Sequence, residues 1–366
     1  MTTFPTAYSD ILQRIDQLDP RTYSRTRNYL DGSVSRLSPY LTHGVISTRF
    51  VGARVLSTYS VKDSESFIRE LAWKDYFRLV WDTYGDGIFS DLRHPQPSVE
   101  SNQVPTALLD ARTGISVLDD GLRELLQTGY IHNHLRLWLA MLTCSVGHAH
   151  WWEPSKWMYY HLLDGDLASN SLSWQWVAGS FRGSPYIANQ ENINTFSSTI
   201  QRNTFLDTDY ETLSAIETPE PLRSRQSVAL PCTLPDTPTP LISGDSITLY
   251  HPWSLDPTWR VSENATKILL LEPSHFSRHP ISKTRLDFIL KLASEIPDLQ
   301  VFTAEFSQLS EIVQGRPLFF RQYPAIKHWV GNAELSLPLF VHNNTSTPLS
   351  FSAFWKHSRM SVTEGV

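Results

Sequence analysis

Apolar residues recur at helical spacing through most of the first two hundred positions. The stretch Ser116–Thr128 is followed by Gly129, a residue that commonly ends a helix. A second set repeats every three or four positions: Ile131, Leu135, Trp138, Leu139 and Leu142. No run of alternating strands occurs in this half, so we expect residues 1–210 to form a mostly α-helical domain.

The pattern changes after about residue 210. Six prolines follow within a short stretch, and such a stretch is typical of a linker with little regular structure. They are Pro219, Pro221, Pro231, Pro235, Pro238 and Pro240. We therefore expect a linker over residues 211–245.

Residues 246–366 alternate between strand-like and helix-like patterns. Lys267–Glu272 and Leu299–Thr303 are candidate buried strands, and a helix face formed by Leu286, Ile289, Leu290 and Ala293 lies between them. Two more apolar runs follow at Pro317–Phe320 and Leu337–Val341. This order predicts a small α/β domain with a parallel sheet and a right-handed crossover. No glycine-rich loop follows Glu272, so a dinucleotide site is not supported there, and the domain's role stays open.

Composition narrows the class of protein. The chain is 41% hydrophobic and 19% charged, as soluble globular proteins are. It has no run of about 18 apolar residues and no secretory leader, so we expect a cytoplasmic protein without a membrane span. The two cysteines, Cys144 and Cys232, argue against a disulfide framework, a zinc site or a four-cysteine iron–sulfur cluster.

Charge is unevenly distributed along the chain. The net charge is −6, which disfavours nucleic-acid binding, but residues 1–60 hold seven arginines and four aspartates, a local balance of 7 − 4 = +3. A basic patch and a solvated helix face are both compatible with these arginines.

Two segments carry candidate ligand-binding chemistry. In Ser33–Thr42, Ser38 before Pro39 predicts a helix N-terminus that would suit a phosphate, or simply an ordinary capped helix. In Glu70–Phe77, a carboxylate, an indole and an ammonium fall within about one helical turn. They suit a planar or anionic ligand, but a salt-bridged amphipathic helix explains them too.

Two further segments belong together, Thr128–Leu137 and Asp164–Trp176. Asp164 and Asp166 flank Gly165, and two acids at this spacing could suggest a metal. No further ligand stands at suitable spacing, so we expect no metal site. An ion pair between Asp164 and Arg136 is the better account of one acid.

These four segments, in this order, resemble the FAD-binding domain of the photolyase/cryptochrome superfamily over residues 15–195. The resemblance implies FAD as cofactor, with Asn170 facing flavin N5, Asp164 paired with Arg136, and Asp166 at the ribose or ring edge. The positions that match cofactor-binding residues of the family are Tyr23, Val34, Ser35, Arg36, Leu37, Ser38, Lys74, Arg136, Asp164, Gly165, Asp166 and Asn170.

The resemblance also implies a substrate. Glu70 and Asn133 match residues that contact the lesion in cyclobutane pyrimidine dimer photolyases, and Trp73 and Trp176 match the two tryptophans that wall the flipped lesion. Photolyases for the (6-4) lesion need two histidines where Asn133 and Leu137 stand. Arg27 and His134 match DNA-contacting positions, although His134 replaces the usual arginine. UV-damaged DNA is therefore the expected partner. The resemblance implies a monomeric, nucleoid-associated enzyme, a deoxyribodipyrimidine photolyase that repairs by light-driven electron transfer.

Trp174 and Trp151 match the proximal and middle members of the family's electron-transfer chain, and Tyr84, Trp152 or Trp157 could be the distal one. The family's usual N-terminal α/β domain has no room before residue 15, so we expect no antenna pigment. The α/β region after residue 240 could be a shrunken or relocated counterpart. The alternative function is a cryptochrome-like blue-light photoreceptor without repair activity.

Overall fold

The computed structural model describes residues 4–313, 315–336, 338–342, 347–348 and 350–361. These residues form two compact units, each assembled from separate stretches of the chain. The helical unit comprises residues 19–34 and 77–230. The mixed unit comprises residues 4–18, 35–76 and the described residues from 231 onwards. The boundaries at 210 and 245 drawn from the sequence do not coincide with the boundaries of these units.

Helices and short connections build the helical unit. In chain order its elements are α2 (Pro20–Thr26), the end of α5 (Val61–Tyr84), the 3₁₀ turn η1 (Gly85–Phe89), β1 (Val104–Pro105), α6 (Thr106–Leu109), α7 (Ser116–Thr128), α8 (Asn133–Met141), the π-helical turn η2 (Leu142–Val146), α9 (Trp152–His161), α10 (Leu167–Ala178), α11 (Gln190–Ser197), α12 (Tyr210–Ser214), α13 (Glu220–Arg223) and β2 (Arg225–Gln226). Strands β1 and β2 pair antiparallel.

Helix α7 ends where the sequence predicts it. Gly129 adopts φ +73°, a left-handed conformation that glycine reaches without strain, and its N–H bonds to the carbonyl of Leu125. The residues after it lead directly into α8, which begins at Asn133. Trp138, Trp151, Trp174 and Cys144 are all buried in the core of this unit.

A parallel sheet with helices forms much of the mixed unit. Its elements are α1 (Tyr8–Asp16), α3 (Ser38–Thr42), α4 (Thr48–Leu56), the first part of α5, β3 (Ser246–Tyr250), β4 (Ala265–Leu271), α14 (Pro273–Arg278), α15 (Lys283–Ala293), β5 (Leu299–Thr303), α16 (Phe306–Ile312), β6 (Leu318–Arg321), the 3₁₀ turn η3 (Pro324–Ile326), β7 (Asn332–Glu334), β8 (Phe340–His342), α17 (Phe351–His357) and β9 (Ser358–Met360).

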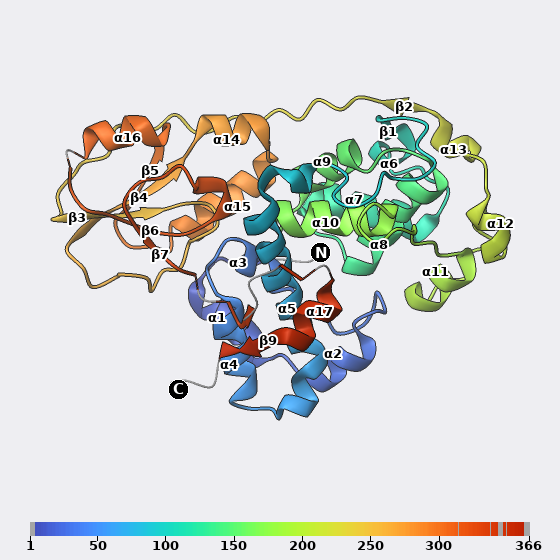
Figure 1. Cartoon of the computed structure of the whole chain (residues 1–366), viewed down its shortest axis with the longest axis horizontal. Helices are drawn as coiled ribbons and strands as arrows, with labels where there is room; N and C mark the ends of the chain where they lie inside the picture. Colours follow the sequence, from blue (N-terminus) through green and yellow to red (C-terminus); the bar gives the residue numbers. More distant parts are fainter. Residues whose placement is uncertain (1–3, 314, 337, 343–346, 349, 362–366) are drawn as a thin grey trace. The chain divides into compact units, whose positions relative to one another are not determined.

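The sheet has five parallel strands in the order β5-β4-β3-β6-β7. Figure 1 shows them side by side, with α14, α15 and α16 beside them. The strand of this sheet that comes first in the sequence, β3, is central, so the winding direction reverses there, as in doubly wound folds. Strand β4 is buried along almost its whole length, and its second half, Ile268–Leu271, is continuously apolar instead of alternating. The predicted fold class, a helical part followed by a small parallel α/β part, is confirmed.

Several local expectations need correction. Ser38 is the first helical residue of α3 and not its N-cap, because Leu37 occupies that position without a side-chain cap. The run ending at Val341 supplies β8, which pairs with β9 in a separate antiparallel ribbon and not in the main sheet; Leu337 lies outside the described residues. None of the described helices is both long and apolar enough to cross a bilayer.

Candidate functional site

The acids of the Asp164–Trp176 segment have distinct partners in the helical unit. Asp164 accepts a hydrogen bond from Nη2 of Arg136 at 2.9 Å, and its side chain is 3% exposed. Arg136 is itself oriented by a bond from Nε to the carbonyl oxygen of Ile131 at 3.0 Å. A nearly buried carboxylate is tolerated when a well-placed cation compensates its desolvation. The ion pair expected from the sequence is therefore present.

Asp166 shapes the backbone that follows. It is the N-cap of α10, where its Oδ1 accepts from the N–H of Ser169 at 2.8 Å. The N–H of the intervening Gly165 donates to the carbonyl of Leu162 at 3.1 Å. These bonds fix where α10 begins and hence the direction of the side chains on its first turns.

Asn170 is held with a defined amide orientation. Its Nδ2 donates to the carbonyl oxygen of Ser155 at 3.0 Å. Within the described part of the chain no donor bonds to its Oδ1, so the amide oxygen is an available acceptor. Trp174 lies one turn further along the same face of α10. An amide acceptor beside a buried indole suits a planar ring that carries an N–H.

Trp151 and Trp174 are both buried, at 0% and 2% exposure. The ring of Trp152 meets that of Trp151 edge to face, with centroids 5.4 Å apart. Trp157 instead packs against His161 at 5.2 Å. Of the two tryptophans offered as distal members, Trp152 is thus the one in ring contact with Trp151.

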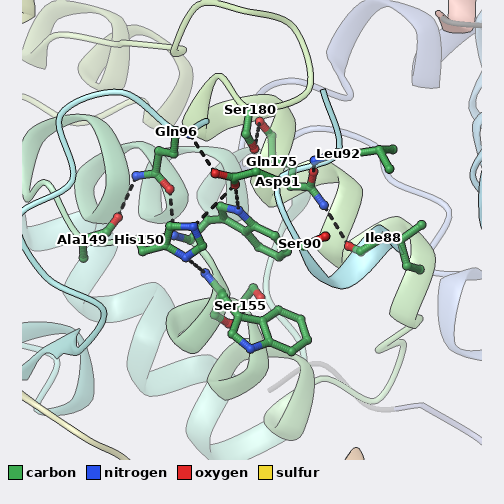
Figure 2. A network of polar contacts seen from close by, with 12 residues as sticks. Ile88, Ser90, Asp91, Leu92, Gln96, Ala149, His150, Ser155, Gln175 and Ser180 are labelled. Atoms are coloured by element: carbon green, nitrogen blue, oxygen red, sulfur yellow. Dashed lines mark hydrogen bonds and ion pairs between the residues drawn. The ribbon is translucent and has the colours of Figure 1, made fainter. Parts of the chain in front are cut away.

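A residue that the sequence did not single out, Asp91, bonds to Trp151. Its Oδ1 accepts from Nε1 of the indole at 2.7 Å, and its Oδ2 accepts from the N–H of Gln96 at 2.9 Å. Figure 2 shows Asp91 between Gln96 and His150. Asp91 stands in no recognisable motif and is 60 positions from Trp151, so a pattern search offered no signal for it.

Trp176 carries a cation on its ring. The guanidinium of Arg182 lies 4.7 Å from the ring centroid, and Tyr186 packs against it at 5.9 Å. Asn133, the first residue of α8, is exposed.

The two positions matched to DNA contacts differ in environment. His134 stacks on Trp138 at 4.3 Å, and its Nδ1 bonds to the carbonyl oxygen of Asn28 at 2.7 Å. Burial lowers the pKa of His134, although its bond to the Asn28 carbonyl acts to raise it, so the charged form of the ring is disfavoured. Arg27 lies 5.8 Å over the ring of Tyr23, the residue matched to a cofactor phosphate.

Residues matched on α5 belong to the mixed unit. Lys74 donates from Nζ to Oγ1 of Thr42 at 3.4 Å. The ring of Trp73 stacks on Phe351 of α17 with centroids 3.8 Å apart and an interplanar angle of 9°. Phe351 therefore occupies a face of the indole that the sequence assigned to a lesion. Glu70 is half-buried on the same helix, one turn before Lys74.

The Val34–Ser38 stretch gives no support to a phosphate site built on a helix N-terminus. Helix α3 is only five residues long, so few aligned peptide dipoles stand behind its first N–H groups. Arg36 adopts φ +52°, and the N–H of Leu37 bonds to Oγ of Ser35 at 3.4 Å. Val34 falls in the helical unit and Ser35–Ser38 in the mixed unit. The described residues also contain no group of three or more His, Cys, Asp or Glu side chains suited to a metal ion.

The region that contains most of these residues is similar to known proteins. Residues 67–210 match the family model of the FAD binding domain of DNA photolyase. Deoxyribodipyrimidine photo-lyase of Streptomyces griseus is 32% identical over 150 residues, which are 40% of this chain and 32% of that protein. Cryptochrome DASH of Gloeobacter violaceus is 32% identical over 169 residues, 43% of this chain and 34% of that protein.

Solved structures align over a similar extent. A Synechocystis cryptochrome gives a TM-score of 0.47 at 24% identity, covering 53% of this chain and 44% of that one. A class III photolyase from Agrobacterium tumefaciens gives 0.46 at 26% identity. The aligned segment spans about a third of the length of the curated relatives. Residues 67–210 of this chain are therefore similar in sequence to the FAD-binding domain of photolyases and to cryptochromes of the DASH type.

Proposed function

We propose that this protein binds FAD and uses light to repair cyclobutane pyrimidine dimers in DNA by electron transfer. The observation that carries the proposal is the orientation of Asn170, whose amide oxygen is left available by the bond from Nδ2 to Ser155. Such an acceptor fits a reduced flavin, which carries an N–H at N5. FAD, when bound, supplies a light-absorbing carrier of single electrons, the chemistry that the protein's own side chains lack.

In this proposal the protein's side chains bind FAD and orient its flavin ring. Asn170 would accept a hydrogen bond from the flavin ring, while Asp166 and the Arg136–Asp164 pair would hold neighbouring polar groups. Lys74 and Tyr23 are proposed phosphate contacts by resemblance alone, and so is the stretch 34–38.

Substrate choice rests on residue identities. Glu70 is proposed to hydrogen-bond the pyrimidine carbonyls and to stabilise charge that develops on them. Trp73 and Trp176 would stack on the lesion, and Asn133 would contact it. Because neither Asn133 nor Leu137 is histidine, dimer repair is favoured over repair of the (6-4) lesion. Arg27 is the proposed contact to the DNA backbone.

Two observations favour the second candidate, a blue-light photoreceptor that does not repair. One face of Trp73 is taken by Phe351 at 3.8 Å, and His134 stacks on Trp138 with a pKa that burial lowers. Repair requires Phe351 to leave this indole, whereas a photoreceptor does not.

The two functions are separated by illuminating the reduced protein with dimer-containing DNA. Repair predicts loss of dimers only in light, after flavin absorption bands have been verified in the purified protein. Dimers that persist while reduced flavin is bound would establish the photoreceptor instead. A preparation without flavin bands would contradict both functions.

Glu70→Ala tests the proposed role of the carboxyl group. We expect repair to fall roughly 10²-fold, the usual effect of removing one group that stabilises developing charge, with flavin still bound. Glu65→Ala is the matched control, because Glu65 is an exposed carboxylate on the same helix. Loss of flavin from Glu70→Ala, or equal slowing by the control, would contradict the assignment.

A further inference from the structure

The indole of Trp151 has a carboxylate as its hydrogen-bond partner. Trp151 is fully buried, and its Nε1–H donates to Oδ1 of Asp91 over 2.7 Å. Any buried indole N–H needs an acceptor, and a neutral carbonyl would suffice for packing. A carboxylate adds two properties that a carbonyl lacks: a negative charge beside the ring and the capacity to take up a proton.

Asp91 is fixed in place from several sides. Its Oδ2 accepts from the N–H of Gln96, and the Gln96 side chain in turn accepts from the N–H of Trp151 and donates to the carbonyl of Ala149, each at 2.9 Å. His150 places Nε2 3.5 Å from Oδ1 of Asp91. Figure 2 shows this network. These contacts hold the Asp91 carboxylate against the indole N–H of Trp151.

The segment that carries Asp91 is anchored to α10. Gln175 accepts from the N–H of Leu92 at 2.9 Å and donates to the carbonyl of Ile88 at 2.8 Å. Gln175 is itself fully buried and directly follows Trp174. The helix that bears the proposed proximal tryptophan therefore also positions the base beside the proposed middle one.

The neighbouring Trp152 lies beside an ion pair and not beside a single carboxylate. The ammonium of Lys156 lies 5.3 Å from its ring centroid, and Glu153 pairs with that ammonium. A positive charge that forms on oxidation is stabilised beside the Asp91 carboxylate, whereas the paired charges of Lys156 and Glu153 largely offset each other at Trp152. The side chain of Asp91 is 26% exposed, so a proton held there can exchange with water.

We propose that Asp91 is the proton acceptor that makes Trp151 the terminus of the electron-transfer chain. The inference rests on the proposed function, because the oxidant is a photoexcited flavin. One electron leaves Trp151 for that flavin by way of Trp174, and the indole proton moves along the 2.7 Å bond to Asp91. The products are a neutral indolyl radical and a carboxylic acid. A soluble thiol then supplies one electron, Asp91 returns the proton, and Trp151 is restored.

This assignment explains how the chain can act without a distal tryptophan. Proton loss removes the positive charge that would otherwise drive the electron back, so the radical survives without moving further outward. Trp152 is then a packing residue of the site and not a relay.

Transient absorption after a light flash tests the proposal on the flavin-loaded protein. The native protein should form a tryptophan radical cation that converts to the deprotonated radical, which absorbs at shorter wavelength, and D₂O should slow that conversion. In Asp91→Asn the cation should persist and recombine, and the yield of reduced flavin should fall roughly tenfold, about the effect of losing one charge-assisted hydrogen bond.

Two control variants sharpen the test. Glu153→Gln makes the same change of charge near Trp152 and should leave the conversion unchanged, as should Trp152→Phe. A deprotonated radical formed at the native rate in Asp91→Asn would overturn the proposal. So would loss of the long-lived radical in Trp152→Phe, which would make Trp152 the terminus.

A measurement without cofactor separates the inference from the proposed function. The indole ¹H–¹⁵N resonance of Trp151, identified by its absence in Trp151→Phe, should lie downfield in the native protein and move upfield in Asp91→Asn. An unshifted resonance would overturn the Asp91 contact whether or not flavin binds. Should Asp91→Asn not fold, the absence of a D₂O effect on the native conversion would overturn the proposal by itself.

Discussion

At the scale of single residues, Asp75 is a carboxyl group whose pKa shift has a clear structural cause. It is buried in the mixed unit, where its two oxygens accept from Oγ1 of Thr48 at 2.8 Å and from the N–H of Phe340 at 3.0 Å. Burial raises the pKa of Asp75 from 3.8 to about 7, although these donors and Lys74 act to lower it.

Stability of the mixed unit should therefore depend on Asp75 between about pH 4 and 7. In that range the folded protein retains a proton that the unfolded chain has released, so the free energy of unfolding falls as pH rises, by about 4 kcal/mol at most. Asp75→Asn, which mimics the neutral acid, should flatten this dependence and stabilise the protein at pH 8. Denaturant unfolding from pH 5 to 8 measures the effect.

The exposed Asp236 provides the control for that series. Asp236→Asn should reproduce the native pH dependence, because it removes an exposed carboxyl group and leaves Asp75 and its partners in place. A slope retained in Asp75→Asn would assign the pH dependence to other groups.

How far single residues could be predicted depends on where their partners lie in the sequence. The Arg136–Asp164 pair was predictable because both members stand in recognisable segments. Asp91 and Asp75 were not, since their partners are 60 and 265 positions away and only the tertiary fold brings them together. Chemistry at a buried position is set by neighbours that no local pattern records.

At the scale of elements, helix α17 decides whether a ligand can stack on the covered face of the Trp73 indole. Phe351 stacks on this indole and is buried. The guanidinium of Arg69 lies 5.6 Å from the centroid of the Phe351 ring. Aromatic pairs of this kind contribute roughly 0.5–1.5 kcal/mol beyond the area they bury.

Phe351→Ala should uncover Trp73. If repair is the function, affinity for dimer-containing DNA should rise about two- to tenfold, the equivalent of that stacking free energy. Acrylamide quenching of fluorescence should increase as well, and the increase should vanish when Trp73→Phe is added. Ser352→Ala, an exposed change on the same helix, is the control. Unchanged quenching would show that Phe351 does not cover Trp73 in solution.

Helices and strands could be predicted where the sequence carries a clear local signal, such as a terminating glycine or an apolar run. Gly129 ended α7 as predicted, because its left-handed conformation excludes most other residues without strain. Strand β4 was predictable from its apolar run and β5 from its mostly apolar, β-branched and aromatic residues, but β7, the largely exposed Asn332–Glu334 segment, carries no such signal. Its partner β6 supplies the hydrogen bonds that define it as a strand.

At the scale of the whole molecule, the mixed unit is assembled from both ends of the chain. His43 bonds through Nδ1 to the carbonyl of Pro252 at 2.7 Å, and its own carbonyl accepts from the N–H of Leu255 at 2.9 Å. The N–H of Leu339 donates to Thr48 at 3.2 Å. A boundary drawn from composition at residue 210 or 245 therefore cuts through one packed unit, because hydrophobic patterning reports local periodicity and not which segments share a core.

This interleaving predicts the fate of a truncated chain. A fragment of residues 1–230 would retain segments 4–18 and 35–76 without the sheet of their unit, so an apolar side chain such as Tyr40, which is now buried and packs against Phe288, would lose that cover. We expect this fragment to aggregate or to unfold without a cooperative transition, as judged by gel filtration and thermal melting. The opposite result, a monomeric fragment with one sharp transition, would show that the helical region folds independently.

A cleavable chain supplies the matched control. Residues 231–240 have no regular structure, so a protease site inserted there should be cut without disturbing either unit. Because segments from both sides of the cut build the mixed unit, the two pieces should still co-elute and melt together. Separation of the pieces after cleavage would mean that the contacts of His43, Thr48 and Asp75 are too weak to hold the mixed unit together. If the pieces co-elute and the 1–230 fragment does not fold, the residues after 230 are part of the same fold and not an appended domain.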